Sequence, residues 1–255
     1  MPDLTLPLDH SRPYVVTGAA SGIGAAVVDL LSEHGATTVT VDLADQPRAT
    51  VHVSGDVADP GTWEVVGRHV DETSTDGAAA LITCAGAIHI GAVTTADPAE
   101  YERLFRINTL GVLHGLQRLV PAMAARGDGA VVAVASVDSL FAEDMMGAYA
   151  TSKGALLQLI RSAAVEHTRH GVRINAVCPG AVDTPLLRHH LSSTGDETAA
   201  RRRVENSTPA GRLLTTLEMA RLLVFLSTPW ASSMAGAAVV ADGGLTATYD
   251  FRLDD

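Results

Sequence analysis

Two residues that could exchange protons with a substrate lie four positions apart in the segment AYATSK (148–153). Tyr149 supplies a phenol and Lys153 an ammonium group, and residues at this spacing share one face of a helix. A free tyrosine has a pKa of about 10 and is a poor base at neutral pH. Lowering it to about 7 takes roughly 4 kcal/mol, which an ammonium about 4 Å away supplies at an effective dielectric of about 20. The pair could therefore act as a general acid and base for an alcohol or carbonyl.

On spacing alone, an ordinary amphipathic helix whose lysine reaches solvent explains the pair better. A second feature is a glycine-rich segment, TGAASGIG (17–24), directly after an apolar run. Its three glycines permit positive φ, close approach of a phosphate and tight packing of the next helix. The helix N-terminus offers unpaired N–H groups to a pyrophosphate. Alone this is a weak signal, because other tight turns look similar.

An acidic residue, Asp42, ends the next apolar run, VTVD. A carboxylate there can accept hydrogen bonds from both ribose hydroxyls of an adenosine and would repel a 2′-phosphate, which predicts NAD over NADP. The alternative is that Asp42 only begins a surface loop. Asp56, after the third apolar run, could hold the adenine amino group, with Val57 packed on the ring. Alternatively, Asp56 only precedes a helix that begins at Asp59-Pro60.

The elements that must position these residues alternate along the chain. Short apolar runs predict strands at 14–17, 37–42, 50–55, 79–85, 129–136, 173–179 and 237–242. Helical patterns lie at 22–34, 60–74, 98–126, 149–170 and 216–227, and the third is long enough for two helices. Gly35 and Gly171 stand where a left-handed C-cap is expected. This alternation predicts an α/β fold of the Rossmann type, a doubly wound, seven-stranded parallel sheet with helices on both faces.

Composition and charge exclude several classes of protein. Hydrophobic residues make up 47% and charged residues 18% of the 255 residues, which is typical of a globular domain. The net charge of −11 argues against nucleic-acid binding and is consistent with solubility. No apolar stretch approaches the ~18 residues that a membrane span needs. We expect one domain over residues 1–255.

The N-terminus lacks a basic segment followed by an apolar run, so we expect no signal peptide and a cytoplasmic protein. Two cysteines, Cys84 and Cys178, are too few for a disulfide framework and are expected to be buried free thiols. No histidine near Cys84 in sequence suggests a base, so we do not expect this residue to be a nucleophile. His189-His190 lacks the further ligands that a metal site needs, so no metal is expected.

Four segments occur in the order TGAASGIG, NTLG, VAVAS and YATSK. Their combination resembles the short-chain dehydrogenase/reductase family, and the resemblance covers about residues 13–244. The resemblance implies that Tyr149 is the acid/base and that Lys153 lowers its pKa and binds the nicotinamide ribose. Ser136 would hold the substrate oxygen; Ser139 is an alternative whose spacing fits less well. Asn108 would bend its helix and help hold a water that relays protons. Alternatively, Ser136 is only a turn residue at the end of a strand. Asn108 could likewise be a buried amide that only forms hydrogen bonds with backbone groups.

The same resemblance assigns further residues to the cofactor. The main chain of Val182 and the hydroxyl of Thr184 would meet the nicotinamide carboxamide, beside a turn at Pro179-Gly180. One departure is TCAG (83–86), where the family usually has two asparagines before alanine and glycine. There Thr83 must supply the hydrogen bonds between strands, or they are lost. The residues expected to bind NAD are Gly18, Ser21, Gly22, Ile23, Gly24, Asp42, Asp56, Val57, Cys84, Ala85, Gly86, Asn108, Tyr149, Lys153, Pro179, Gly180, Val182 and Thr184.

Residues 184–212 are too long for an ordinary connection and are expected to form a substrate loop or lid. Arg201–Arg203 in it are expected on a solvated helix face, with Glu197 and Glu205 as possible partners of Arg201; recruitment by an anionic substrate is the minority hypothesis. The substrate pocket is expected to draw on 137–147 and 186–206. Phe141, Met145 and Met146 suggest an apolar substrate, unless they are packing residues.

The prediction is an NAD-dependent oxidoreductase that transfers a hydride between nicotinamide C4 and a secondary alcohol or ketone. The resemblance implies a homotetramer, or else a dimer, with helices around 98–126 and 149–170 at one interface. The C-terminal tail, residues 245–255, would pack at an interface or be disordered. One alternative is a 3-oxoacyl-carrier-protein reductase, against which Asp42 and the net charge of −11 argue. The other is a dinucleotide-binding sensor without turnover, which has no need for Ser136, Tyr149 and Lys153.

Overall fold

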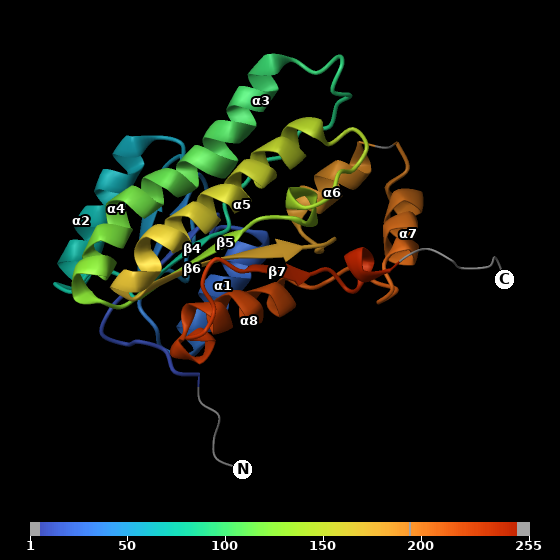
Figure 1. Ribbon diagram of the computed structural model, residues 1–255. Coiled ribbons are helices and arrows are strands. Elements are labelled where there is room, and N and C mark those ends of the chain that lie inside the picture. The colour runs from blue at the N-terminus through green and yellow to red at the C-terminus, as the bar shows by residue number, and fades with distance from the viewer. Residues whose placement is uncertain (1–5, 194, 249–255) are drawn as a thin grey trace, which may run out of the picture.

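A computed structural model describes residues 6–193 and 195–248 of the chain (Figure 1). Within these residues, seven parallel strands form one sheet in the order β3-β2-β1-β4-β5-β6-β7. Every strand lies where the sequence predicts it, with ends that differ by at most two residues. The strands are β1 (Tyr14–Thr17), β2 (Thr38–Asp42), β3 (Val51–Ser54), β4 (Ala80–Thr83), β5 (Gly129–Val134), β6 (Val172–Pro179) and β7 (Ala238–Ala241).

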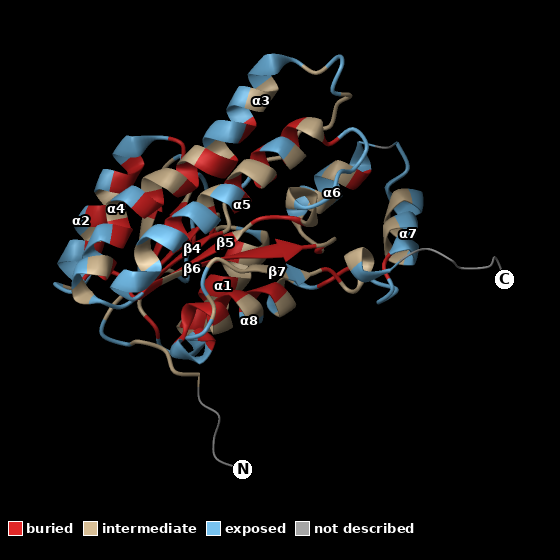
Figure 2. Ribbon diagram, in the orientation of Figure 1, coloured by how far each residue is buried: buried red, intermediate tan, exposed pale blue. Residues whose placement is uncertain are grey.

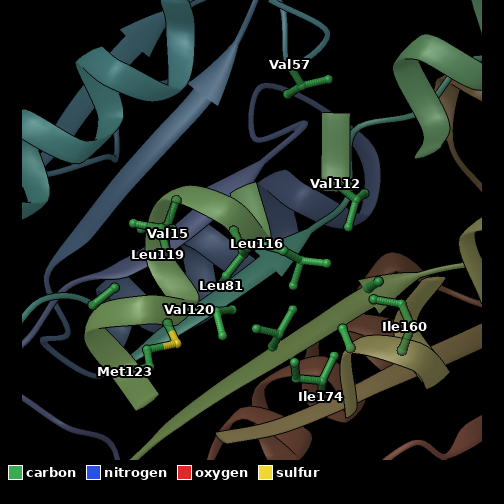
Figure 3. Close-up of a cluster of buried hydrophobic side chains, with 14 of the residues drawn as sticks. Val15, Val57, Leu81, Val112, Leu116, Leu119, Val120, Met123, Ile160 and Ile174 are labelled. Carbon is green, nitrogen blue, oxygen red and sulfur yellow. The ribbon is translucent and has the colours of Figure 1, made fainter. Parts of the chain in front are cut away.

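Helices cover both faces of the sheet, so successive strand residues enter two different cores. Val15 packs with one group of helices and Val16 with the other, and both are fully buried. This explains why the strands are apolar on both faces. The helices on the first face are α2 (Pro60–Thr73), α4 (Gly111–Arg126) and α5 (Gly147–His167), whose core is shown in Figure 3; those on the second are α1 (Gly22–Glu33) and α8 (Thr216–Ser227).

The order of the strands fixes the position of a crevice. β1 pairs with both β2 and β4, so the chain winds outward in one direction through β3 and then restarts on the other side of β1. In open parallel sheets, ligands bind outside the carboxyl ends of the strands at such a switch point. The fold therefore directs attention to the ends of β1 and β4.

The long helical segment at 98–126 is divided into two helices, as its length suggested. α3 (Pro98–Phe105) begins with Asp97, whose side chain accepts a hydrogen bond from the Ala99 N–H. A π-helical turn, η1 (Arg106–Leu110), joins α3 to α4. Single π-turns of this kind occur frequently at functional sites. The predicted left-handed caps are also confirmed, with φ of 72° at Gly35 and 77° at Gly171.

The segment 184–212 contains two helices that the sequence pattern did not locate, α6 (Pro185–Ser192) and α7 (Glu197–Ser207). In Figure 1 they lie on the side to which the strand arrows point. None of the α7 residues is buried, and Figure 2 shows the helix in exposed and intermediate colours. A helix without a buried stripe leaves no apolar periodicity in the sequence. Of the expected C-terminal tail, residues 249–255 lie outside the described residues.

Among the described residues, no helix combines the length and the apolar character required for crossing a bilayer.

Candidate active site

A cavity of about 950 Å³ opens at the carboxyl ends of the strands. Its lining includes every residue that the sequence assigned to catalysis or NAD binding except Asn108, which is fully buried behind it. Segments far apart in the chain, from Gly18 to Thr184, are therefore brought together around one space. This convergence marks the cavity as the candidate active site.

Two glycines of the glycine-rich turn, Gly18 and Gly24, are packed too tightly against backbone to carry a side chain. Gly18 has φ of 64°, and a Cβ on it would lie 2.5 Å from the Ala85 nitrogen. A Cβ on Gly24 would overlap the Gly18 carbonyl oxygen. Ser21 is the N-cap of α1, but its hydroxyl makes no capping hydrogen bond. The turn thus presents bare backbone and the N-terminus of a helix to the cavity, an arrangement that suits a pyrophosphate.

The Asp42 carboxylate lies against this turn and is held in place by backbone N–H groups. It accepts hydrogen bonds from the Ala20 N–H at 2.9 Å and the Ala44 N–H at 3.1 Å. Each carboxylate oxygen can accept a further bond, so ribose hydroxyls can still be bound. The next residue, Leu43, lines the cavity and is 75% exposed, although the sequence reasoning had overlooked it. An apolar side chain beside Asp42 suits an adenine face.

The Asp56 carboxylate accepts a hydrogen bond from the Ala58 N–H at 2.8 Å. Both readings of this residue thus remain, since Asp56 forms a local turn and also lines the cavity. Val57 lines it as well and is buried, with its carbonyl accepting from the Trp63 indole at 2.9 Å.

Tyr149 and Lys153 lie one turn apart on α5, and both are buried. The Lys153 ammonium donates to the Val134 carbonyl at 2.8 Å and lies 5.8 Å from the centre of the Tyr149 ring. The sequence contains one lysine and 17 arginines, so this is the only ε-amine of the protein. Ser136 follows the end of β5 and is buried in the same wall of the cavity.

The protein's own groups do not produce the expected low pKa of the phenol. Burial raises the pKa of Tyr149 above its ordinary value; a hydrogen bond with Ser136 lowers it, and the carboxylates of Asp138 and Glu143 raise it. Burial also lowers the pKa of Lys153 to about 8. Loss of solvation thus outweighs the hydrogen bond with Ser136 in the protein by itself, and the lowering of the Tyr149 pKa by Lys153 stays a prediction for the protein with bound cofactor.

Asn108 lies in the π-turn and connects three segments. Its amide accepts from the Ala87 N–H at 2.8 Å and donates to the Ala87 carbonyl at 3.0 Å. It also donates to the Ser152 hydroxyl at 2.9 Å, which in turn donates to the Tyr149 carbonyl at 2.7 Å. A Cβ on Gly86 would lie 3.3 Å from the Asn108 amide oxygen and 3.5 Å from the Lys153 nitrogen. Asn108 thus links the backbone at Ala87 to the turn of α5 that precedes Lys153.

The unusual TCAG segment follows β4. The Thr83 hydroxyl is buried and has no hydrogen-bond partner among the described residues, so the side-chain bonds between strands are lost rather than replaced. Beyond the backbone pairing of β1 with β4, a side-chain bond is found here: the Ala85 N–H donates to the Thr17 hydroxyl at 3.2 Å. Cys84 is half-buried and lines the cavity, so the expectation of a buried thiol is correct for Cys178 only. Loss of solvation still raises the pKa of Cys84 to about 12, which agrees with a structural thiol.

The segment after β6 closes the cavity on the far side. The Gly180 N–H donates to the Ala241 carbonyl. Val182 forms an isolated β-bridge with Leu214, in which the hydrogen bonds are made by the backbone groups of the residues before and after Val182. The N–H of Val182 itself takes no part in these hydrogen bonds. The Thr184 hydroxyl caps α6 by accepting from the Leu187 N–H at 3.2 Å.

Asp138, Glu143 and His190 are polar lining residues to which the sequence analysis gave no individual role in the site. All three lie within the segments 137–147 and 186–206 that were expected to line the pocket, whereas Arg103, which also lines the cavity, lies outside them. The Ser136 hydroxyl donates to the Asp138 carboxylate at 3.0 Å. The Ser139 hydroxyl accepts from the Ser136 N–H at 3.2 Å. The alternative serine is thus tied to the backbone.

The remaining pocket predictions have mixed outcomes. Phe141 and Met146 line the cavity, whereas Met145 is not among the lining residues and has φ of 62°. Arg201 pairs with Glu205 at 3.0 Å, as expected, and with Asp183 at 3.2 Å; no ion pair to Glu197 is found in the described part of the chain. The described residues also contain no cluster of three or more His, Cys, Asp or Glu suited to a metal.

Comparison with known proteins gives consistent results. A family model described as enoyl-(acyl carrier protein) reductase matches residues 18–246. The cis-4-hydroxycyclohexanecarboxylate dehydrogenase of Sinomonas cyclohexanicum is 34% identical over 251 residues, covering 92% of this chain and 97% of that protein. The 2-(R)-hydroxypropyl-CoM dehydrogenase of Xanthobacter autotrophicus is 33% identical, covering 93% and 99%. L-Sorbose reductase from Gluconobacter frateurii, solved with NADPH and L-sorbose, has a TM-score of 0.87 at 26% identity, covering 96% and 100%.

Proposed function

Because the chain belongs to the short-chain dehydrogenase/reductase family, whose members bind a nicotinamide dinucleotide, we propose that it is an NAD-dependent enzyme. It transfers a hydride between nicotinamide C4 and the carbon of a secondary alcohol or ketone. The observation that carries the proposal is the presence of Ser136, Tyr149 and Lys153 on one wall of the cavity that Asp42 also lines. A binding protein without turnover has no need for that combination.

The cavity fits this cofactor. The bare glycine turn and the N-terminus of α1 receive the pyrophosphate, and Asp42 binds the adenosine ribose. The cations that line the cavity among the described residues are Arg103, Lys153 and His190, on α3, α5 and α6, and none lies beside Asp42 in the sequence. The preference for NAD rests on this arrangement, although the similar L-sorbose reductase was solved with NADPH. The bound dinucleotide supplies the hydride acceptor or donor and, when oxidised, a positive charge.

The chain's own residues handle the proton. The Tyr149 phenol oxygen takes the proton of the alcohol during oxidation and returns it during reduction. Lys153 would hold the nicotinamide ribose, and its ammonium, together with the positive charge that an oxidised nicotinamide would supply, would oppose the burial that raises the Tyr149 pKa. The Ser136 hydroxyl donates to the substrate oxygen as charge develops there. Asn108 positions the backbone around Lys153 and, as the family resemblance implies, supports a proton relay.

The names of both relatives describe oxidation at a secondary hydroxyl group, one on a ring and one on a short chain. We infer the same reaction type for this chain. The description of the matching family model favours a second candidate, an acyl-carrier-protein reductase. The net charge of −11 is unsuited to docking an acidic carrier protein, which makes this candidate the weaker one.

We also propose a cytoplasmic homotetramer built from a single domain over residues 1–255. Residues 184–212, with α6 and α7, would serve as the lid over the substrate. Size measurement in solution tests the tetramer.

The decisive experiment measures NADH formation from NAD across a panel of secondary alcohols. Tyr149→Phe should lower kcat by about 10²- to 10⁴-fold while NAD still binds. Tyr101→Phe is a matched control, because Tyr101 packs in the same apolar cluster but does not line the cavity. Loss of activity in the control, or full activity in Tyr149→Phe, would contradict the assignment. Tight NAD binding with no turnover in either direction would favour a sensor.

A second experiment compares NAD with NADP. The wild type should have the higher kcat/KM with NAD, and Asp42→Ala should narrow that preference because the 2′-phosphate is no longer repelled. An unchanged preference would show that Asp42 does not select the cofactor.

A further inference from the structure

The hydroxyl of Ser136 is engaged on both sides by one residue, Asp138. The hydroxyl donates to the Asp138 carboxylate at 3.0 Å, and the Asp138 N–H donates back to the hydroxyl oxygen at 3.1 Å. Asp138 lies in a short 3₁₀ turn, η2 (Val137–Ser139), and lines the cavity together with Ser136. The carboxylate is therefore within reach of whatever Ser136 binds.

This bond conflicts with the role proposed for Ser136. A hydroxyl has a single proton to donate, so Ser136 cannot donate to the substrate oxygen while it donates to Asp138. When the proton turns to the substrate, the Asp138 carboxylate loses a hydrogen bond in a partly buried position. Leaving such an acceptor unsatisfied is unfavourable, most of all when it is charged. A substrate that replaces the lost donor avoids this penalty.

We propose that Asp138 is a specificity residue that binds a second hydroxyl, carried on the carbon next to the reacting one. The substrate class is then a vicinal diol, or the corresponding α-hydroxyketone in the reverse direction. This inference rests on the proposed function of the same site. The carboxylate only accepts hydrogen bonds at neutral pH, so it selects a donor at that carbon over an ether, a ketone or a carboxylate.

The distance between the two protein oxygens suits this class. The two oxygens of a gauche vicinal diol lie about one hydrogen-bond length apart, which matches the separation of 3.0 Å between Ser136 and Asp138. One substrate oxygen can then face Ser136 and Tyr149 while its neighbour donates to Asp138. Burial, followed by the nearby Glu143 charge, raises the pKa of Asp138, so a further donor would stabilise the ionised form.

The surroundings of Asp138 define the rest of the substrate. Glu143 lies 3.7 Å from the His190 ring nitrogen, and this pair lines the cavity beside Asp138. Phe141, Met146 and Leu186 supply apolar lining. A diol on a carbocyclic or aliphatic frame would place its hydroxyls at Ser136 and Asp138 and its carbons against this apolar lining.

The test compares cyclohexane-1,2-diol, as its cis and trans isomers, with cyclohexanol. With NAD, the wild type should oxidise at least one diol with a kcat/KM at least about 100-fold above that of cyclohexanol, since a site that hydrogen-bonds a substrate hydroxyl can discriminate by up to about 10⁴- to 10⁵-fold. Asp138→Leu should reduce this ratio by about tenfold or more, by weakening diol oxidation and favouring cyclohexanol. Glu143→Gln, which removes the neighbouring charge but not the partner of Ser136, should change the ratio far less. If the Asp138→Leu variant does not fold, Asp138→Asn takes its place in the test. It preserves the shape of the side chain and should give a diol-to-cyclohexanol ratio between those of the wild type and the leucine variant.

A binding measurement separates this inference from the proposed function. Ligand-observed NMR, with the protein free and with NAD, should show tighter binding of the diol than of cyclohexanol in the wild type and not in Asp138→Leu. Selective binding without turnover would uphold the inference and overturn the proposed function. Turnover of all alcohols that depends on Tyr149 but shows no diol preference would overturn the inference alone. Equal effects of the substitutions at Asp138 and Glu143 would also overturn it, because the cluster charge would then explain the selectivity.

Discussion

Replacing Thr83 by valine should stabilise the protein, although the substitution removes a polar group from a central strand. Thr83 is 2% exposed, and its hydroxyl has no hydrogen-bond partner among the described residues. Valine has nearly the same shape and is also β-branched, so packing and strand propensity are retained. What changes is that a buried hydroxyl no longer has to lose its water without compensation.

The magnitude follows from the cost of an unsatisfied buried polar group, about 1–3 kcal/mol in proteins. We expect Thr83→Val to raise the free energy of unfolding by about 1–2 kcal/mol. For a chain of this size, Tm should rise by roughly 2–4 °C per kcal/mol. Urea unfolding at a fixed protein concentration measures the first quantity, and a thermal melt measures the second.

Thr17 provides a matched control, because it is the register partner of Thr83 on β1. Its hydroxyl accepts a hydrogen bond from the Ala85 N–H at 3.2 Å. Thr17→Val leaves that N–H without its acceptor and should lower the free energy of unfolding by about 1–2 kcal/mol. The two identical substitutions should therefore have opposite signs. A similar loss of stability in both variants would refute the reasoning.

Three further predictions concern the site. Gly24→Ala should abolish NAD binding, measured by calorimetry, because its methyl group would overlap the Gly18 carbonyl oxygen; normal affinity would contradict the packing described. Lys153→Met should be more stable than the wild type by up to about 3 kcal/mol below pH 8, since burial lowers the pKa of Lys153 from 10.5 to about 8. Between pH 8 and pH 10 the unfolded wild-type chain binds more protons than the folded one, so the free energy of unfolding of the wild type rises with pH. The difference in the free energy of unfolding between the two proteins, measured by urea unfolding, should therefore shrink from pH 8 to pH 10. A difference that stays constant would be inconsistent with a buried charge at Lys153. Cys84 and Cys178 should resist iodoacetamide at pH 8 in the native protein, because burial raises both thiol pKa values, and rapid alkylation followed by mass spectrometry would disprove this.

The strands and the main helices could be predicted because their apolar residues repeat with a clear period. β1 and α8 begin and end at the predicted residues. The helices α6 and α7 could not be located, since α7 has no buried residue and α6 only one, Leu191. Local capping by Thr184 and Asp196 starts these helices, and capping residues without an apolar pattern are common in loops as well.

Site residues could be predicted where a backbone turn dictates the residue type, and where the order of motifs along the chain resembles that of a known family. Gly18, Gly24 and Asp42 belong to this group. The pairing of Ser136 with Asp138 was not predictable, because it depends on side-chain orientation within a short turn. The raised pKa of Tyr149 depends on burial and on neighbouring carboxylates, which a helical spacing does not reveal.

The single lysine makes this protein unusually simple to observe. Protein made with lysine carrying ¹⁵N only in its side chain would give one ε-amine NMR signal, and that signal would come from the candidate active site. Its chemical shift would follow protonation directly near pH 8, without assignment of any other resonance. The same property means that amine-directed cross-linkers can react only with the chain's N-terminal amine and this buried group. Carboxylate- or arginine-directed reagents are therefore the appropriate ones for mapping the proposed subunit contacts.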